Sequence, residues 1–196
     1  STAVGNTSDY HVNAKINLSA GENFITAIGE EYLSSETAPT FWTVVTDAAS
    51  MQNISLSGNS VLGADIDLST VSATNNWTPI SYFTGMFDGL GHTISNLHIN
   101  NSSIKNNIGL FRQTENVAKI ANINLTNVDI TGNDNVGALV GTARSTHIEN
   151  VSSSGKVVGV FSVGGLVGYM TESPVTLLKS HSSADVSGTD ESIGGL

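Results

Sequence analysis

A short glycine-rich phrase recurs through the second half of this 196-residue chain. Asn135-Val-Gly-Ala-Leu-Val-Gly141 returns as Ser162-Val-Gly-Gly-Leu-Val-Gly168, 27 residues later, and begins again at Ser192-Ile-Gly-Gly-Leu196, another 30 residues on. Asn107-Ile-Gly-Leu-Phe111 is a degenerate upstream copy. Self-similarity at a period of about 20 to 50 residues is typical of solenoids and other repeat folds. This period constrains the fold more than any single motif does.

Two further short elements recur in the same order as the glycine-rich phrase. The first has a central Asn in its clear copies: Ile94-Ser-Asn-Leu97, Ile120-Ala-Asn-Ile123, Ile148-Glu-Asn-Val151 and the weaker Leu177-Leu-Lys-Ser180. The second ends in Gly: Val128-Asp-Ile-Thr-Gly132, Lys156-Val-Val-Gly159 and Asp185-Val-Ser-Gly188. Three strand-like pieces per 26–30 residues, separated by Gly, Asn and Ser, describe one coil of a solenoid.

The apolar residues favour stacked strands over helices. Val and Ile total 33 against 14 Leu, which is a bias toward β-structure. The pair Gly164-Gly165 would cost about 1 kcal/mol per residue inside a helix. Identical coils stacked about 4.8 Å apart would place Leu on Leu and Val on Val in a continuous interior. We therefore predict an all-β, parallel β-solenoid.

The Asn of the first recurring element falls at positions 96, 122 and 150. Stacked Asn side chains at a turn can bond their amides to the next coil. We predict an internal ladder of Asn96, Asn122 and Asn150 that Lys179 ends or interrupts. The alternative is that these residues are merely polar turn residues.

Several blocks together carry a resemblance to a known family. They are Val61-Leu-Gly-Ala-Asp-Ile-Asp-Leu-Ser69, Trp77-Thr-Pro-Ile80, the stretch from Phe83 to Leu97, and the Val-Gly-Gly-Leu-Val-Gly repeats. From about Asp47 to Leu196 the chain resembles the GLUG-repeat segments of large bacterial surface and secreted proteins. These include filamentous-haemagglutinin-like adhesins and the amino-terminal regions of some immunoglobulin A peptidases. The resemblance implies a right-handed parallel β-helix that serves as a rigid stalk or adhesive shaft. The chain departs from the pattern at Gly109-Leu-Phe-Arg112, which lacks the terminal Gly.

The chain is expected to divide near residue 46. Residues 1–46 are predicted to form capping strands, at His11–Leu18 and Asn23–Ile28, and a loop from Gly29 to Thr40. Residues 47–196 are predicted to form the GLUG-type β-helix, whose C-terminal coil is incomplete. Thr46–Gln52 has a plausible N-cap and reads as a short helical turn that would cover the first coil. Solenoids need such caps because their end coils expose unpaired backbone groups.

Charge and composition exclude several classes of protein. The formal net charge is −10, so no basic stripe is available to neutralise phosphates and nucleic acid is a poor partner. No apolar run approaches about 18 residues, so we expect no membrane insertion. The absence of Cys excludes disulfides, Cys-based zinc sites and thiol nucleophiles. This composition is common in bacterial exported proteins, and we expect an extracellular or cell-surface location.

Acidic and histidine residues were weighed as candidate sites. Asp65 and Asp67 would share one strand face, where paired carboxylates suit Ca²⁺ or acid–base work, but solvent-facing or turn-capping roles are favoured. Asp88-Gly-Leu-Gly91 reads as a tight turn. The five histidines lack metal spacing and are expected at surface or packing positions: His11, His92, His98, His147 and His181. We therefore predict no catalytic, cofactor-binding or metal residues.

An enzymatic alternative comes from polysaccharide lyases and hydrolases, which also use parallel β-helices. Arg112 and Arg144 follow the repeated phrase in neighbouring coils and might share a face with Glu115 or Glu149; an ordinary surface ion pair is the favoured interpretation. The aromatic cluster of Phe41-Trp42, Trp77, Tyr82-Phe83 and Phe87 is expected to pack the first coils rather than to stack on sugars.

The predicted function is a non-enzymatic structural or adhesive segment of a bacterial surface or secreted adhesin. Its partner would be a glycan or protein on a host or neighbouring cell. Because the chain stops after Gly194-Gly-Leu196, within a strand element, two explanations are open: a fragment of a longer protein, which is favoured, or a filament subunit that associates end to end.

Overall fold

The computed structural model describes residues 42–69, 71, 76–100, 105–171, 174–190 and 192–196. It contains one short helix, α1 (Ala48–Gln52). The strands of the first coils are β1 (Trp42–Val45), β2 (Asn59–Leu62), β3 (Ile66–Asp67), β4 (Met86–Asp88), β5 (Thr93–Ser95) and β6 (His98–Ile99). The next are β7 (Asn106–Ile108), β8 (Phe111–Thr114), β9 (Ala118–Thr131), β10 (Asp134–Val136), β11 (Val140–Arg144) and β12 (Thr146–Val158). The last are β13 (Phe161–Gly164), β14 (Val167–Thr171), β15 (Thr176–Leu178), β16 (His181–Ser182), β17 (Asp185–Ser187) and β18 (Ile193–Gly194).

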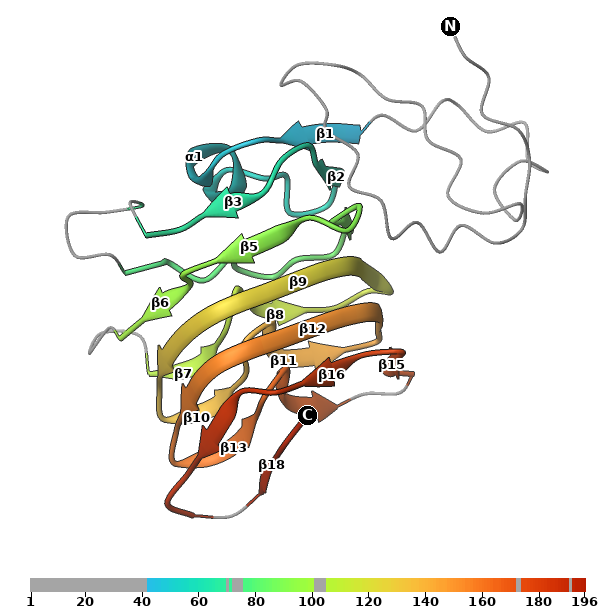
Figure 1. The fold of residues 1–196 in the computed structure, drawn as a ribbon. Coiled ribbons are helices and arrows are strands. Elements are labelled where there is room, and N and C mark those ends of the chain that lie inside the picture. Colours follow the sequence, from blue (N-terminus) through green and yellow to red (C-terminus); the bar gives the residue numbers. More distant parts are fainter. Residues whose placement is uncertain (1–41, 70, 72–75, 101–104, 172–173, 191) are drawn as a thin grey trace, which may run out of the picture.

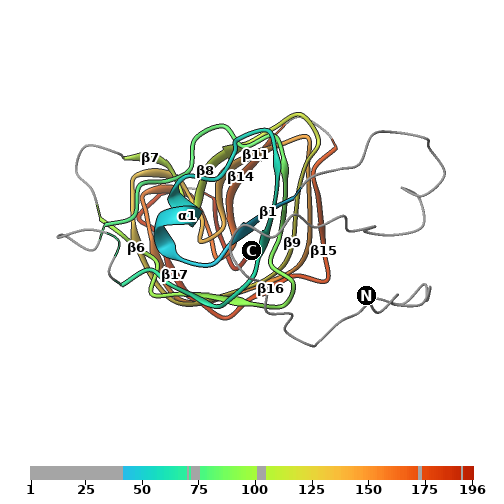
Figure 2. The same cartoon turned by 90° about the horizontal axis from the view of Figure 1, so that it is seen from above.

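These strands stack as a parallel β-solenoid of about four turns (Figure 1). The strand pairings among the described residues are parallel. The large sheet runs in the order β1-β2-β4-β9-β12-β15, and the two smaller sheets run β18-β13-β10-β7 and β14-β11-β8. Viewed along the stack, the coils superpose as one closed outline (Figure 2). The predicted all-β solenoid is confirmed.

The copies of the glycine-rich phrase stack on one another in the predicted alignment. Val136 pairs with Ile108 on one side and with Val163 on the other, and Val163 pairs with Ile193. Gly141 shows why glycine is needed in this phrase, because a Cβ there would lie 2.3 Å from the backbone carbon of Asn107. The recurring phrase therefore places the backbones of adjacent coils in close contact.

The alignment of the Asn-containing element is confirmed for the later coils and wrong for the first. Ile120 pairs with Ile148, which pairs with Leu177, as predicted. Ile94, however, pairs with Leu125, and Phe87 takes the place opposite Ile120. The turn between β4 and β5 is the reason. Asp88 faces Ala121 and Thr93 faces Asn124, so the turn uses more residues than β9 uses to cover the same corner.

The interior of the coils is a continuous apolar core. Aromatic rings fill its first levels: Phe83 and Phe111 have centroids 4.9 Å apart, and Phe87 meets Phe111 at 5.7 Å. Trp77 is also fully buried, and its indole nitrogen donates to the carbonyl of Leu110. The prediction that these aromatic residues pack the first coils is confirmed.

Helix α1 covers the N-terminal end of the core (Figures 1 and 2). Asp47 is its N-cap, accepting from the backbone N–H of Ser50 at 2.7 Å, and the Ser50 hydroxyl completes a capping box. Met51, which is fully buried, extends from α1 into the core. The helical turn predicted over Thr46–Gln52 is confirmed.

The predicted strands at His11–Leu18 and Asn23–Ile28, and the predicted loop from Gly29 to Thr40, lie outside the described residues. Strand β1 falls at the end of the predicted N-terminal segment and forms the first level of the large sheet. In the described part of the chain, no helix is long and apolar enough to cross a membrane.

Candidate functional site: a polar groove at a corner of the solenoid

Asparagine occupies sharp corners of the coils. Six corner asparagines adopt positive φ angles between 53° and 59°: Asn96, Asn107, Asn122, Asn127, Asn135 and Asn150. A left-handed conformation is costly for most residues, and Asn is among the few side chains that tolerate it. The recurring Asn is therefore required first by the backbone.

The corner side chains form ladders between coils. The amide nitrogen of Asn150 donates to the side-chain oxygen of Asn122 at 2.8 Å, and Asn122 donates to Asp88 at 3.0 Å. The predicted stacking of Asn122 and Asn150 is confirmed. The ladder is not internal, because Asn150 is exposed on the outer side of the corner.

Asn96 belongs to a different ladder, which corrects the prediction for this residue. Asn127 donates to the side-chain oxygen of Asn96 at 2.6 Å, and Asn96 donates to Asp67 at 2.8 Å. The shift has the same cause as the altered pairing of Ile94. A third ladder joins Asn135 to Asn107 at 2.8 Å.

Lys179 ends the Asn122–Asn150 ladder, as predicted. Because Glu149 pairs with Leu178, Lys179 stands at the level after Asn150, and it keeps the corner conformation with a φ of 50°. Its ammonium group bonds to Glu149 at 2.9 Å. This hydrogen bond is the main reason that the pKa of the Glu149 carboxyl is lowered.

A second polar column runs beside this ladder. Asn124, Ser152 and His181 occupy successive levels in register, and the Ser152 hydroxyl donates to the side-chain oxygen of Asn124. In each coil the ladder residue and the column residue flank one residue between them, such as the buried Ile123. The two rows enclose a shallow groove of about 160 Å³, which we call the corner groove; it is lined by Asn122, Asn124, Asn150, Ser152, Lys179 and His181, among others.

A second groove, of about 540 Å³, lies between α1 and β3. Its three carboxylates cap backbone turns or strands: Asp47 accepts from Ser50, Asp65 from Thr93 and Asp67 from Ser69. Hydrogen bonding, first from Asn96, lowers the pKa of Asp67. Among the described residues, no group of three or more His, Cys, Asp or Glu side chains is placed to hold a metal ion. The turn-capping roles expected for Asp65 and Asp67 agree with these contacts.

Asp88 begins the tight turn that was predicted. Its carboxylate accepts from the backbone N–H of Leu90 at 2.8 Å, and the N–H of His92 donates to the carbonyl of Gly89. Asp88 is only 5% exposed, and this burial raises the pKa of its carboxyl. The carboxylate thus joins the turn to the ladder through Asn122.

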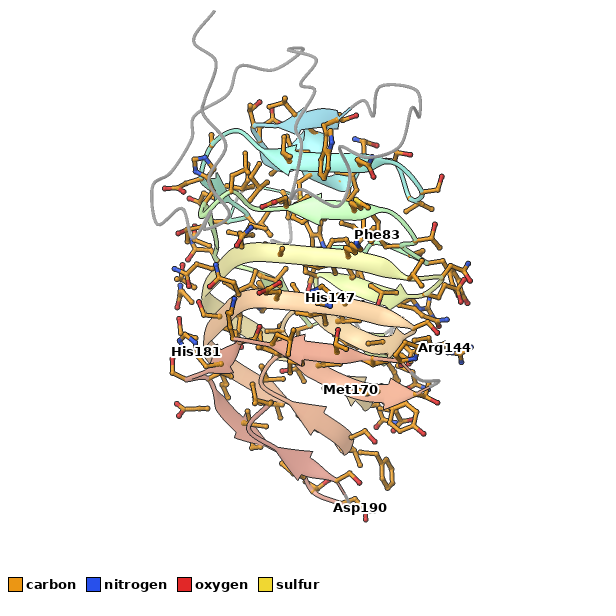
Figure 3. The ribbon with its side chains drawn as sticks, turned by 90° about the vertical axis from the view of Figure 1, so that its right-hand side faces the viewer. Phe83, Arg144, His147, Met170, His181 and Asp190 are labelled. Atoms are coloured by element: carbon orange, nitrogen blue, oxygen red, sulfur yellow. The ribbon has the colours of Figure 1, made fainter. Side chains whose placement is uncertain are left out.

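The described histidines connect adjacent coils. His92 is buried with its Nδ1 3.1 Å from Asp65, and His98 Nδ1 lies 3.1 Å from Asp129. His147 lies in the face of the large sheet in Figure 3, 2.6 Å from the Thr176 hydroxyl and 3.4 Å from Glu149. The sequence did not predict these pairs, although their separations of 27, 31 and 29 residues are close to one coil.

The residues of the enzymatic alternative do not converge as that alternative requires. Phe111 pairs with Val140 and Gln113 with Thr142, so Arg112 stands opposite Gly141 rather than Arg144. Glu149 bonds to Lys179 and His147. In Figure 3, Arg144 and His181 lie at opposite edges of the molecule. The corner groove is therefore the stronger candidate, and its chemistry is hydrogen bonding.

Comparison with known proteins aligns this chain with segments of much larger ones. A sequence profile described as the M26 IgA1-specific metallo-endopeptidase N-terminal region matches residues 40–155. Halomucin from Haloquadratum walsbyi is 38% identical over 138 residues, which are 64% of this chain and 2% of halomucin. An immunoglobulin A1 protease of Streptococcus pneumoniae is 30% identical over 125 residues, which are 57% of this chain and 6% of the protease.

A solved structure shares the fold. It is a Bacteroides ovatus protein whose crystal structure bears the provisional name of an immunoglobulin A1 protease. The two superpose with a TM-score of 0.63 at 17% sequence identity, over 79% of this chain and 52% of that one. The chain thus spans about half of this structure and only a small part of the sequence relatives.

Proposed function

Because this chain belongs to the family of M26 IgA1-specific metallo-endopeptidase N-terminal regions, we propose that it is a non-catalytic, stiff segment of a bacterial surface or secreted protein. The observation that carries this proposal is the unbroken stack of strands from β1 to β15 over one apolar core. Each coil contacts only its neighbours, so the stack acts as a spacer that holds what precedes and follows it apart.

The resemblance to amino-terminal regions of immunoglobulin A peptidases agrees with this family. The GLUG assignment, the adhesin role and the location remain proposals. An enzyme named for immunoglobulin A1 acts on an antibody, which circulates outside cells, and this supports an extracellular or cell-surface location for the present chain. Its partner would be a glycan or protein on a host or neighbouring cell.

The family description names a metallo-endopeptidase, but the residues of this chain do not fit a metallopeptidase zinc site. The sequence has no His-Glu-x-x-His motif, in which two histidines one helical turn apart hold zinc. The described histidines lie on strands or turns and pair with carboxylates or hydroxyls of other coils, except His181, which is exposed. The proposal therefore assigns no catalytic step to this segment.

The spacer role is tested by measuring stiffness. Because the chain has no Cys, the double variant Leu56→Cys and Asp185→Cys can be labelled with a dye pair at two exposed positions near opposite ends of the stack. Single-molecule energy transfer should give one narrow distance, whereas a Gly/Ser linker of equal length gives a broad distribution. A broad distribution for the folded chain in native buffer would refute the spacer role.

The non-catalytic part is tested separately with immunoglobulin A1 and a panel of polysaccharides. We expect no turnover of any of them. Turnover that disappears in Arg144→Ala would overturn this part of the proposal and support the enzymatic alternative.

A second candidate function is end-to-end self-association. Large apolar side chains are exposed on the last level of the stack, including Tyr169 at 47%, Met170 at 41% and Leu178 at 47%. A second copy would add its strands to this edge by β-augmentation. Sedimentation should then depend on protein concentration, and Met170→Lys should abolish that dependence because an edge lysine opposes strand addition. A chain that is monomeric at every concentration contradicts this candidate.

A further inference from the structure

We propose that the corner groove binds a neutral, extended glycan that lies along the axis of the solenoid. This inference rests on the adhesive part of the proposed function and names the site and ligand class for it. The groove runs across successive coils, from the level of Asn122 to the level of Lys179. A ligand that follows it must be long and repetitive, as the groove itself is.

The side chains of the groove retain hydrogen-bonding capacity after their ladder contacts are made. An Asn amide has two N–H donors and an oxygen that accepts twice. Asn122 uses one donor on Asp88 and one acceptor site on Asn150. The contact of Asn124 with Ser152 uses only its oxygen, so its two N–H groups face outward unspent in these ladders. Sugar hydroxyls, which both donate and accept, match this mixture of donors and acceptors.

The spacing of the groove favours a polymer over a small molecule. Parallel strands repeat about every 4.8 Å, so equivalent amides recur at that interval along the axis. The volume of about 160 Å³ is well below that of a pocket that buries a small-molecule ligand, about 300–1,000 Å³. Sugar units would lie on the groove rather than within it, each making the same few contacts at successive levels.

The charges around the groove favour a neutral ligand. The chain carries a formal net charge of −10, which repels polyanions. Lys179, the ammonium group among the lining residues, already bonds to Glu149. Among the described residues that line the groove there is no Trp, Tyr or Phe on which a sugar ring would stack, so we expect weak binding, in the range of about 1 mM.

The test is a nuclear magnetic resonance titration of the full chain with a neutral β-1,4-linked glucose hexamer, the corresponding trimer and an acidic galacturonate hexamer. We expect the side-chain amide signals of Asn122, Asn124 and Asn150 to shift with the neutral hexamer. Affinity should fall at least fivefold for the trimer and for the acidic hexamer. Asn124→Ala should weaken binding of the neutral hexamer at least fivefold.

A matched pair of variants separates binding from stability. Asn150→Ala and Asn127→Ala each remove an exposed corner Asn with a φ of 53° and one ladder hydrogen bond, but only Asn150 lines the groove. We expect binding to fall in Asn150→Ala and to persist in Asn127→Ala. Equal losses in both variants, tighter binding of the acidic hexamer, or no shift with any of the three probes would overturn the inference. The energy-transfer result is independent of these outcomes, so the glycan site can fail while the spacer role stands.

Discussion

At the scale of single residues, the corner asparagines combine two demands that few side chains meet together. The backbone there is left-handed, and the side chain must also reach the adjacent coil. Gly would satisfy the first demand without the second, and Ala would satisfy neither. This explains why Asn recurs where other repeats would use Gly, and it makes the contribution of each demand measurable.

Asn150→Ala should lower the melting temperature by about 4–8 °C. It loses one hydrogen bond, worth about 1 kcal/mol, and places a residue with a Cβ in a left-handed conformation at a further cost of about 1 kcal/mol. For a chain of this size each kcal/mol shifts the melting temperature by about 2–4 °C. Asn150→Gly is the control, because it keeps the conformation and loses only the side chain, so its drop should be smaller. Equal melting temperatures for Asn150→Ala and the parent chain would remove the ladder as a source of stability.

Asp88→Asn should raise the melting temperature at neutral pH. Burial raises the pKa of Asp88 above its ordinary value of 3.8, so ionisation of this group costs the folded state more than the unfolded state. Its stabilising contribution is therefore greatest below pH 3.8 and declines as the pH rises through the folded pKa. The amide in the variant still accepts from Leu90 and Asn122 without that cost.

The pH dependence distinguishes this explanation from a simple packing effect. Calorimetry of the parent and Asp88→Asn chains from acidic to neutral pH should show a difference that grows with pH. A difference of constant size across that range, or a variant that is less stable at neutral pH, would mean that the charge of Asp88 is not the cause.

At the scale of strands and turns, the sequence predicts alignment well wherever coils have equal length. The phrase beginning at Asn135 aligns with the copy at Ser162 because the chain between them has the same turns. It fails at Ile94, where the longer turn after Asp88 shifts the register and moves Asn96 from one ladder to another. A local motif match carries no information about how many residues a preceding turn consumes.

The corner groove was also beyond direct prediction. Asn150 and Ser152 could be identified as polar residues of a repeated element, but the column of Asn124, Ser152 and His181 appears only after the coils are placed in register. The inter-coil contacts of His92 and His147 were missed for the same reason. In each case the two partners lie about one coil apart in sequence.

Lys179→Asn should extend the ladder by one level and raise the melting temperature by about 2–4 °C. Asn tolerates the left-handed corner better than Lys, by about 1 kcal/mol, and gains a hydrogen bond to Asn150 worth about 1 kcal/mol. The lost contact with Glu149 is partly exposed, and such ion pairs contribute about 0–1 kcal/mol. In the variant the pKa of Glu149 should rise, because Lys179 is the main cause of its depression. A lower melting temperature would show that the ion pair outweighs the ladder.

At the scale of the whole molecule, stability should be distributed unevenly along the stack. Repeat folds behave as a chain of units coupled to their nearest neighbours, so an end coil with one neighbour is less protected than a middle coil with two. Burial follows this expectation: Ile120 and Ile148 are fully buried, whereas Leu177 at the next aligned level is only partly buried. The last level also exposes Leu178 and Ile193.

Native-state hydrogen exchange should therefore show a gradient, slowest in β9 and β12 and fastest in β15 to β18, because opening the last level requires separation from one neighbour only. Ile120→Ala, in a middle coil, should cost about 2–5 kcal/mol and speed exchange throughout the stack. Leu177→Ala should cost less and speed exchange mainly in β15 to β18, since the coils above it stay paired with one another. If exchange is equally slow at every level, and Leu177→Ala speeds it everywhere, the coils unfold as one unit, and the nearest-neighbour description of this solenoid is wrong.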